Sequence, residues 1–314
     1  MWSYVIRRTL YSIPVYFGIL LLVMAALRVN DPVYAYLSKD ASPEEYQAFQ
    51  EKAGLDQPFH VQYWRFLGSA LSQQSWDKPG ESVGALLKQS VGPTLAITVP
   101  ALVLTSVLSI LIGLISAFNR GRWLDKTLVT FAVLGMSVSF LVYIVLGQYF
   151  GAFQLNMALG KGLFAVQGYD TSRPAWWIHF CLLPVLISTV VAMGYDTRFY
   201  RTVMVEECTK DYLRTARAKG LSESRVMFKH MLKNAMISIV TRVMITLPFL
   251  IMGSILLEMY FNIPGMGKML ITALNAKDFP VVQGFTAVFA VLLLLTNILT
   301  DVLYGLVDPR VRLS

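Results

Sequence analysis

The hydrophobic residues of the chain gather in six long runs, separated by polar segments of very unequal length. Each run has about 19–25 residues, the length that a helix needs to cross roughly 30 Å of hydrocarbon. The pattern therefore predicts an all-α polytopic membrane protein with about six transmembrane helices. The expected spans are residues 9–27, 94–118, 127–150, 176–197, 236–258 and 283–307.

The first run follows Arg7 and Arg8, an arrangement that a secretory signal peptide also has. A signal peptide, however, has an apolar core of only about 7–15 residues. The run at 9–27 is longer, so we interpret it as an anchor that the protein retains.

The distribution of basic residues sets the expected orientation, because Lys and Arg are enriched in cytoplasmic segments. The segment 198–235 has nine Lys and Arg against four acids, whereas 29–93 has five against eight acids. Basic residues also precede the first run and occupy the segment 119–126. We therefore expect the cytoplasmic membrane of a prokaryote, with both termini, 119–126 and 198–235 in the cytoplasm and 29–93 outside.

Composition agrees with a membrane protein, since 55% of residues are hydrophobic and 15% charged. Soluble domains have roughly 25% charged residues. The net charge of +8 is accounted for by the cytoplasmic segments, and no nucleic-acid partner is expected. The two cysteines, Cys181 and Cys208, imply no disulfide framework.

The expected spans divide the chain into four parts. The long outer segment is expected to form a cap with short helices of its own at Pro43–Ala53 and Val61–Leu71. The parts are an N-terminal tip with the first helix at 1–28, the extracytoplasmic cap at 29–93, a five-helix transmembrane core at 94–307, and a cytoplasmic tail at 308–314.

The sequence has no motif for nucleotide hydrolysis, nucleophilic catalysis or metal binding. The nearest string to a Walker A loop, Pro264-Gly265-Met266-Gly267-Lys268, lacks the first glycine, and Met269 stands where Ser or Thr should bind magnesium. The three histidines are scattered along the chain. We therefore expect no catalytic residue, metal or cofactor on this chain, and any energy source must lie on another chain.

The segment 198–235 contains a predicted rigid corner between two short helices. Gly220 suits the left-handed position after the first helix, and Ser222 suits the N-cap of the second. Leu221 and Val226 have the spacing of a hydrophobic staple. A solvated basic loop would explain the charge but not the cap, the staple and the small residues at the corner. We therefore predict that this corner docks onto another protein.

The same residues resemble a known family. Arg214-Thr-Ala-Arg-Ala-Lys-Gly-Leu-Ser222, followed by His230-x-Leu-x-Asn-Ala235, is similar to the coupling loop of ATP-binding-cassette (ABC) importer permeases. The generic loop reads Glu-Ala-Ala with a glycine four residues later. Arg214, Thr215, Ala216 and Gly220 form the variant usual in the first permease subunit of the dipeptide, oligopeptide and nickel branch, of the oligopeptide permease B type.

Further strings match this branch in order along nearly the whole chain. They are Tyr4-x-x-Arg7-Arg8, Gly54-Leu-Asp-Gln-Pro58, Gln62-Tyr63-x-x-Phe66-Leu67, Arg198-x-x-Arg201, Met204-x-Glu206, Glu258-x-x-Phe261-x-x-Pro264-Gly265-x-Gly267, Asp278-x-Pro280-Val281-x-x-Gly284, Asn297-x-x-x-Asp301-x-x-Tyr304 and Asp308-Pro309-Arg310-x-Arg312.

The resemblance implies a type I ABC importer permease-like bundle with a cytoplasmic coupling helix. It implies a second permease subunit, two cytoplasmic ATPases that bind ATP and magnesium, and an extracytoplasmic substrate-binding protein. The implied ATPase-docking residues are Asp211, Tyr212, Arg214, Thr215, Ala216, Arg217, Ala218, Lys219, Gly220, Leu221 and Ser222.

The chain also departs from the branch. The third span often has a proline where Val138 stands, and the string Val29-Asn30-Asp31-Pro32 differs from the usual Pro-Gly-Asp-Pro. Peptides, nickel complexes and oligosaccharides remain open as substrates. The alternative function is an ion-gradient-driven secondary transporter or a channel, but secondary carriers often have inverted repeats and mid-membrane carboxylates, which this sequence does not show.

Three ionisable residues in or beside the spans need an interpretation, because such residues are often functional. Glu258 and Asp301 are candidates for the substrate pathway, with helix packing as the alternative. Arg242 is expected to extend toward the cytoplasmic surface with its charge in the interface, with a role in the pore as the alternative.

Overall fold

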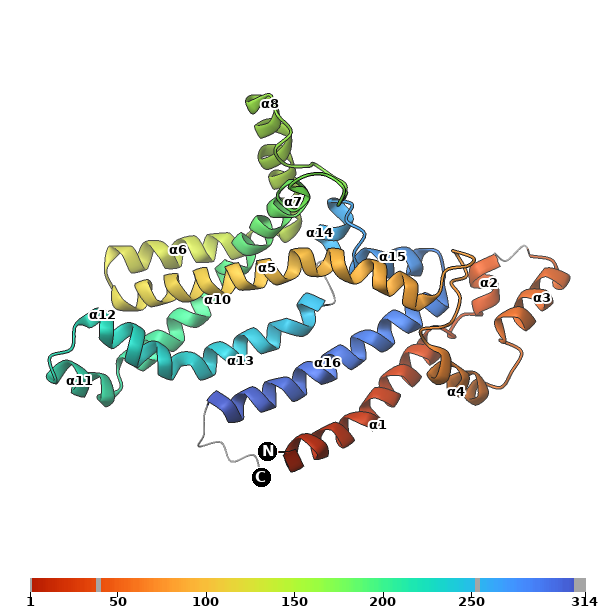
Figure 1. Ribbon diagram of the computed structural model, residues 1–314, viewed down its shortest axis with the longest axis horizontal. Helices are drawn as coiled ribbons and strands as arrows, with labels where there is room; N and C mark the ends of the chain where they lie inside the picture. The colour runs from red at the N-terminus through yellow and green to blue at the C-terminus, as the bar shows by residue number, and fades with distance from the viewer. Residues whose placement is uncertain (1, 38–40, 252–254, 308–314) are drawn as a thin grey trace.

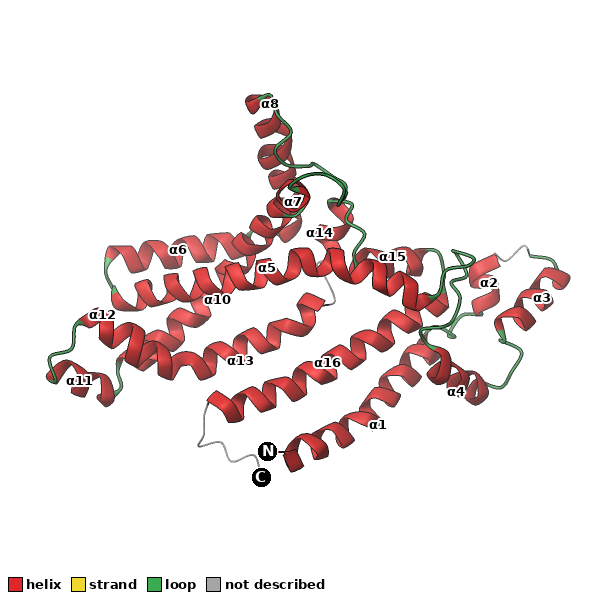
Figure 2. Cartoon of the chain, in the orientation of Figure 1, coloured by secondary structure: helices red, strands yellow, loops and turns green. Residues whose placement is uncertain are grey.

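The computed structural model describes residues 2–37, 41–251 and 255–307, and most of this part of the chain is helical (Figure 1, Figure 2). The predicted all-α class is confirmed. The predicted tail at 308–314, with its Asp308-Pro309-Arg310 string, lies outside the described residues.

Five long helices form the body of the molecule: α1 (Trp2–Ala26), α5 (Val83–Phe118), α10 (Leu182–Cys208), α13 (Leu232–Ile251) and α16 (Phe279–Val307). The shorter helices are α2 (Pro32–Leu37), α3 (Pro43–Ala53), α4 (Phe59–Ser69), α6 (Trp123–Ser137), α7 (Phe140–Leu146), α8 (Leu155–Leu159), α9 (Trp176–Phe180), α11 (Asp211–Ala218), α12 (Glu223–Arg225), α14 (Ile255–Tyr260) and α15 (Met266–Asn275). Two π-helical stretches, Gly147–Gln154 and Val226–Met231, continue α7 and α12.

Four stretches of the described residues are long and apolar enough to cross a membrane: Ile6–Ala26, Val83–Phe118, Phe140–Leu159 and Phe279–Leu303. The predicted span at 176–197 covers α9 and the first part of α10. The predicted span at 236–258 covers most of α13 and the start of α14, with residues 252–254 between them outside the described part. Short helices gather at the two ends of the long ones, with α11 at one end and α2, α3 and α4 at the other (Figure 1). We call these the α11 end and the cap end.

The third predicted span, 127–150, is wrong as a single helix. Helix α6 ends at Ser137, Val138 and Ser139 are extended with φ of −90° and −60°, and α7 begins at Phe140. The chain turns sharply at this break, so that α7 and α8 project away from the plane of α5 and α6 (Figure 1). The break forms without the proline that the family often has there.

The cap end follows the sequence closely in its local structure. Ser42 and Glu45 form the two hydrogen bonds of a capping box at the start of α3, and Gly54 ends α3 in the left-handed conformation with φ of 66°. The second predicted cap helix, 61–71, is α4 and begins two residues earlier. Residues 83–93 of the predicted cap form the first part of α5.

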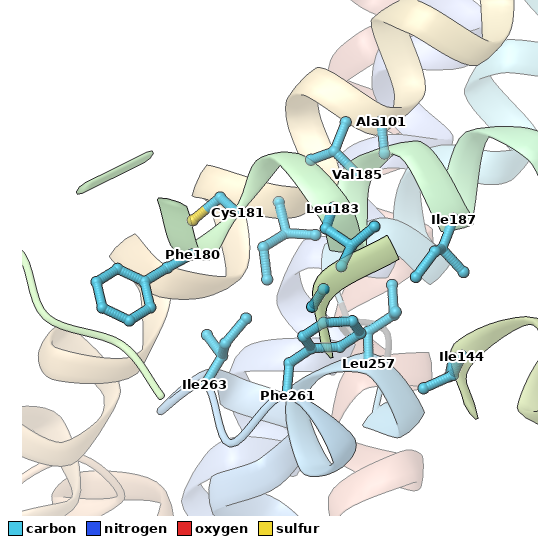
Figure 3. Packing of buried hydrophobic residues seen from close by; sticks show 12 residues of the cluster. Ala101, Ile144, Phe180, Cys181, Leu183, Val185, Ile187, Leu257, Phe261 and Ile263 are labelled. Carbon is cyan, nitrogen blue, oxygen red and sulfur yellow. The ribbon is translucent and has the colours of Figure 1, made fainter. Parts of the chain in front are cut away.

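The core is divided into four separate clusters of buried side chains. One joins α5, α10 and α14 and includes Phe180, Cys181, Leu257 and Phe261 (Figure 3). A second lies beneath α11, and the remaining two lie at the cap end. Glycine allows the closest helix contacts: a Cβ at Gly113 of α5 would lie 3.0 Å from the backbone nitrogen of Arg201 in α10.

Candidate functional site

The predicted corner is present at the α11 end. Lys219 is the C-cap of α11, and Gly220 follows it with φ of 75°. The backbone amide of Gly220 donates to the carbonyl of Arg217 at 2.9 Å, and the amide of Leu221 donates to Ala216 at 3.4 Å. These two bonds define a Schellman motif. The chain direction after α11 is therefore fixed by backbone hydrogen bonds, as the sequence predicts.

The side of the corner that faces the molecule is anchored by apolar packing. Leu213 and Ala216 of α11 are buried in one cluster with Val226, and Leu221 packs against the same cluster. Leu221 and Val226 thus form the predicted hydrophobic staple. Because the cluster continues through Tyr200 of α10 into the body of the molecule, a displacement of α11 cannot occur without moving that packing.

The opposite side of the corner is exposed and carries three basic residues against one acid. Its exposed members are Asp211, Arg214, Thr215, Arg217, Ala218, Lys219, Gly220 and Ser222. Arg217 pairs with Glu223 across the corner at 2.9 Å, and Arg214 lies 3.4 Å from Asp211. The corner therefore brings eight of the eleven predicted docking residues onto one exposed side, whereas Ala216 is buried and Tyr212 and Leu221 pack against the cluster beneath α11.

Two details of the predicted corner differ in the structure. Ser222 occupies the N-cap position, but its side chain accepts no capping hydrogen bond. The expected short second helix is the beginning of a longer one, because α12 passes through the π-helical stretch Val226–Met231 into α13 without a break. The corner is thus joined directly to a helix that enters the body of the molecule.

Tyr212 fixes the start of α11 to the end of α10. Its hydroxyl donates to the Glu207 carboxylate at 2.6 Å. Burial, and then the neighbouring carboxylate, raises the pKa of the Tyr212 phenol above its usual range. The phenol therefore remains a neutral donor at physiological pH, and no pattern along the sequence indicates its partner.

A buried ion pair supports the α11 end from the side. The Asp125 carboxylate accepts hydrogen bonds from Nε and Nη2 of Arg201 at 2.7 and 2.8 Å, from the Ser116 hydroxyl at 2.5 Å and from the Gly121 amide at 2.9 Å. Hydrogen bonding from Arg201 holds the pKa of Asp125 well below its usual range, although burial opposes this shift. The pair joins the α5–α6 turn to α10.

The sequence interpretation did not find this ion pair. Arg201 belongs to a string that matches the family, but nothing along the chain connects it with Asp125, which lies 76 residues away. Arg242 also has an unexpected partner: its Nη2 lies 2.9 Å from the Asp196 carboxylate. The sequence did not indicate this partner, and the direction in which Arg242 extends stays a prediction.

Glu258 and Asp301, the two candidate pathway acids, are both held by groups of this chain. Glu258 is 1% exposed and accepts hydrogen bonds from the Thr94 hydroxyl at 2.7 Å and the Lys268 amide at 2.9 Å. A Cβ at Gly265 would overlap the Glu258 carboxyl group. Asp301 pairs with Arg8 at 3.0 Å. These contacts favour helix packing, and a role in the substrate pathway stays a prediction.

A bundle of long apolar helices with a rigid, exposed corner at one end is the architecture of a membrane-embedded protein. Among the described residues, no group of three or more His, Cys, Asp or Glu side chains is placed to hold a metal ion. The chain belongs to the family of binding-protein-dependent transport system inner membrane components, whose model matches residues 109–313. The corresponding N-terminal model matches residues 1–94.

Curated relatives match over the full length. The chain is 31% identical to the oligopeptide transport system permease protein AppB of Bacillus subtilis (strain 168), covering 99% of this chain and 100% of AppB. It is 33% identical to the glutathione transport system permease protein GsiC of Escherichia coli (strain K12), with 99% of each chain covered.

The fold also matches a solved structure of the MetNI methionine ABC transporter in inward-facing conformations. The TM-score is 0.54 at 18% identity, and the match covers 71% of this chain and 96% of that chain. The expected type I importer fold is thus confirmed. The chain is a permease component of an ABC importer.

Proposed function

We propose that this chain forms half of the translocation pathway of an ATP-driven importer for peptides or related small solutes. The full-length relatives AppB and GsiC support this substrate class, since they are named for oligopeptide and glutathione transport. Neither name excludes a nickel complex or an oligosaccharide here. In this proposal the chain catalyses no reaction and binds no cofactor.

The proposed assembly has two permease subunits, two cytoplasmic ATPases and an extracytoplasmic substrate-binding protein. ATP and magnesium bind to the ATPases, and the second permease is a different chain. The α11 end faces the cytoplasm and the cap end faces outward, which agrees with the excess of basic residues in 198–235.

The rigidity of the α11 corner carries the docking proposal. A flexible loop would absorb a push from an ATPase, whereas α11 is fixed by a Schellman motif, by the Tyr212–Glu207 hydrogen bond and by a buried apolar cluster. The same cluster contains residues of α5 and α10, and the second arm of the corner continues into α13. ATP-driven closure of the ATPases would therefore move three long helices together.

Gly220→Val tests the docking role with little effect on folding. A Cβ at position 220 would meet nothing within 4 Å, so the substitution costs only the left-handed conformation, about 1–2 kcal/mol. We expect normal abundance in the membrane, at least about a tenfold loss of ATP-driven uptake, which corresponds to roughly 1.4 kcal/mol, and loss of ATPase pull-down.

Gly160→Val is the matched control. Gly160 ends α8 with φ of 60°, and a Cβ at this position would likewise meet nothing within 4 Å, so the strain is the same at a place far from α11. We expect Gly160→Val to retain ATPase pull-down. Wild-type uptake by Gly220→Val, in a strain without the native copy, would contradict the docking role.

A further inference from the structure

The break between α6 and α7 is an exposed stretch of non-helical backbone. Ser137, Val138 and Ser139 are all exposed on the surface of this chain. The phenol of Tyr143 donates to the Gly135 carbonyl at 2.9 Å, and that of Tyr195 to the Met136 carbonyl at 3.4 Å. Side chains thus supply donors to the last turn of α6, which ends with Ser137, while Val138 and Ser139 form the exposed non-helical stretch that follows.

The position of Asp125 indicates the depth of this break. Asp125 forms its ion pair in the first turn of α6, and a charged pair of this kind marks the boundary of the apolar layer. Ser137 lies 12 residues further along α6, which is about 18 Å at 1.5 Å per residue. The break therefore lies near the middle of a hydrocarbon layer of roughly 30 Å.

Lipid is a poor environment for such a break. Each backbone N–H or C=O without a partner costs several kcal/mol in hydrocarbon, so non-helical backbone at this depth is confined to protein interiors and water-filled cavities. The exposure of Val138 and Ser139 shows that this chain does not bury this non-helical stretch. They must be covered by another subunit or by water.

Polar side chains around the break favour water. Hydroxyl groups flank Val138 on both sides, and Tyr195 and Arg198 of α10 are also exposed beside it. The Nη1 atom of Arg198 lies 3.2 Å from the Met136 sulfur, so the guanidinium adjoins the break while keeping an exposed face. Arg198 lies one turn of α10 from Arg201, so its backbone is close to the apolar boundary and its side chain extends toward the break. A charge in this position is costly in lipid and is favoured by a bundle interior or a water-filled cavity.

We propose that the α6–α7 break lines the aqueous translocation pathway, with Ser137, Ser139, Tyr195 and Arg198 as its solute-facing groups. The proposal rests on the proposed importer function. In this proposal the break contacts water and the passing solute, and it makes no permanent contact with the second permease subunit.

Cysteine accessibility tests this assignment in the full importer complex, reconstituted in proteoliposomes. Ser139→Cys and Ser137→Cys are made in a chain lacking native thiols (Cys181→Ala, Cys208→Ser), with Phe131→Cys as the control. Phe131 is 68% exposed on the same helix, six residues before α6 ends at Ser137. A cationic methanethiosulfonate reagent measures access to water, in the nucleotide-free state and after trapping with ATP and vanadate.

We expect modification of both serine positions at least about ten times faster than of Phe131→Cys, with a change of several-fold between the two states. A rate equal to that of Phe131→Cys in both states would overturn the proposal, since the break would then face lipid or a fixed subunit contact. A fast rate that is the same in both states would overturn it as well. Neither result affects the importer function, which fails separately if the wild-type chain supports no ATP-driven uptake.

Discussion

Two arginines near the α11 end form ion pairs of opposite character. The Arg201–Asp125 pair is largely buried, with side-chain exposures of 26% and 4%, whereas Arg217 and Glu223 are 41% and 47% exposed. An exposed pair contributes about 0.2–1 kcal/mol, whereas removing one partner of a buried pair costs about 3–5 kcal/mol because a charge is left without compensation. We therefore expect Arg201 to matter for stability and Arg217 for docking.

Replacing Arg201 and replacing Asp125 should reduce the stability of the protein by different amounts. Arg201→Gln leaves a buried carboxylate, so we expect a loss of about 3–5 kcal/mol. Asp125→Asn leaves a guanidinium that can turn toward water, so we expect a smaller loss of about 1–3 kcal/mol. Unfolding in mixed detergent micelles measures both. Equal losses would contradict the burial argument.

The same pair predicts the pH dependence of the wild-type chain. Because the folded-state pKa of Asp125 is depressed, its contribution is fully present above the usual aspartate pKa of about 3.9 and is lost as pH falls through the folded value. We therefore expect the difference in stability between wild type and Asp125→Asn to stay constant from about pH 5 to 8 and to shrink only in stronger acid.

Exchanging the charges of Arg217 and Glu223 tests whether Arg217 acts by docking to the ATPase or by making the corner rigid. Arg217→Glu places two carboxylates together and reverses the charge of the surface, whereas Arg217→Glu with Glu223→Arg restores the ion pair of 2.9 Å in the opposite sense. We expect both variants to lose most ATP-driven uptake, because the ATPase meets the wrong charge in each. Full recovery of uptake by the double variant would instead assign Arg217 to rigidity alone.

At the scale of single residues, conformations that depend on neighbours in sequence could be predicted, whereas ion pairs between distant parts of the chain could not. Gly220 could be predicted because a left-handed residue after a helix depends only on its neighbours in sequence. The partners of Arg201 and Arg242 lie 76 and 46 residues away, and many acids compete for them along the chain. Only the packing of α10 against α6 and α13 decides between these acids.

At the scale of elements, α6 and α7 show how a helix can be interrupted without glycine or proline. The Tyr143 phenol turns back to the Gly135 carbonyl, so a residue after the break stabilises the turn before it. Hydrophobic periodicity continues through this segment, which is why a single span was predicted. By contrast, α3 was predicted with correct ends because Ser42, Glu45 and Gly54 carry its caps.

Proline scanning should distinguish the break from the helix that precedes it. Ser139 has φ of −60°, Val138 before it is extended, and the Ser139 side chain makes no capping bond, so Ser139→Pro fits the backbone. We expect unchanged abundance and thermal stability. Ala132→Pro, in the middle of α6, should lose about 3 kcal/mol. Equal destabilisation by both would show that residue 139 is helical.

At the scale of the whole molecule, the α11 end and the cap end have different surfaces and different partners in the proposed assembly. The cap end is held to α16 by Asp278, which accepts hydrogen bonds from the Ser75 hydroxyl and from the backbone amide of Trp76 at 3.2 Å. The ring of Trp76 packs against Phe279. A cap fixed in this way can receive a binding protein without collapsing onto the pathway.

Side-specific labelling checks the orientation of the two ends. Gln47 in α3 and Ser224 in α12 are both exposed, so each accepts a cysteine without disturbing the core. In intact cells, an impermeant maleimide should label Gln47→Cys and leave Ser224→Cys unreacted until the membrane is opened. The reverse pattern would invert the topology and remove the basis for docking at α11.

The separation of the core into clusters has a consequence for biogenesis. The cluster beneath α11 is complete once Ile239 has been made, whereas the clusters at the cap end join Leu20 and Val83 to Phe285 and Ala287. At about 5–20 residues per second, a ribosome makes the intervening segment in roughly 2–10 s. During that interval the nascent chain can already form its cytoplasmic corner. Its first helix and its cap cannot complete their apolar packing until the last helix has entered the membrane.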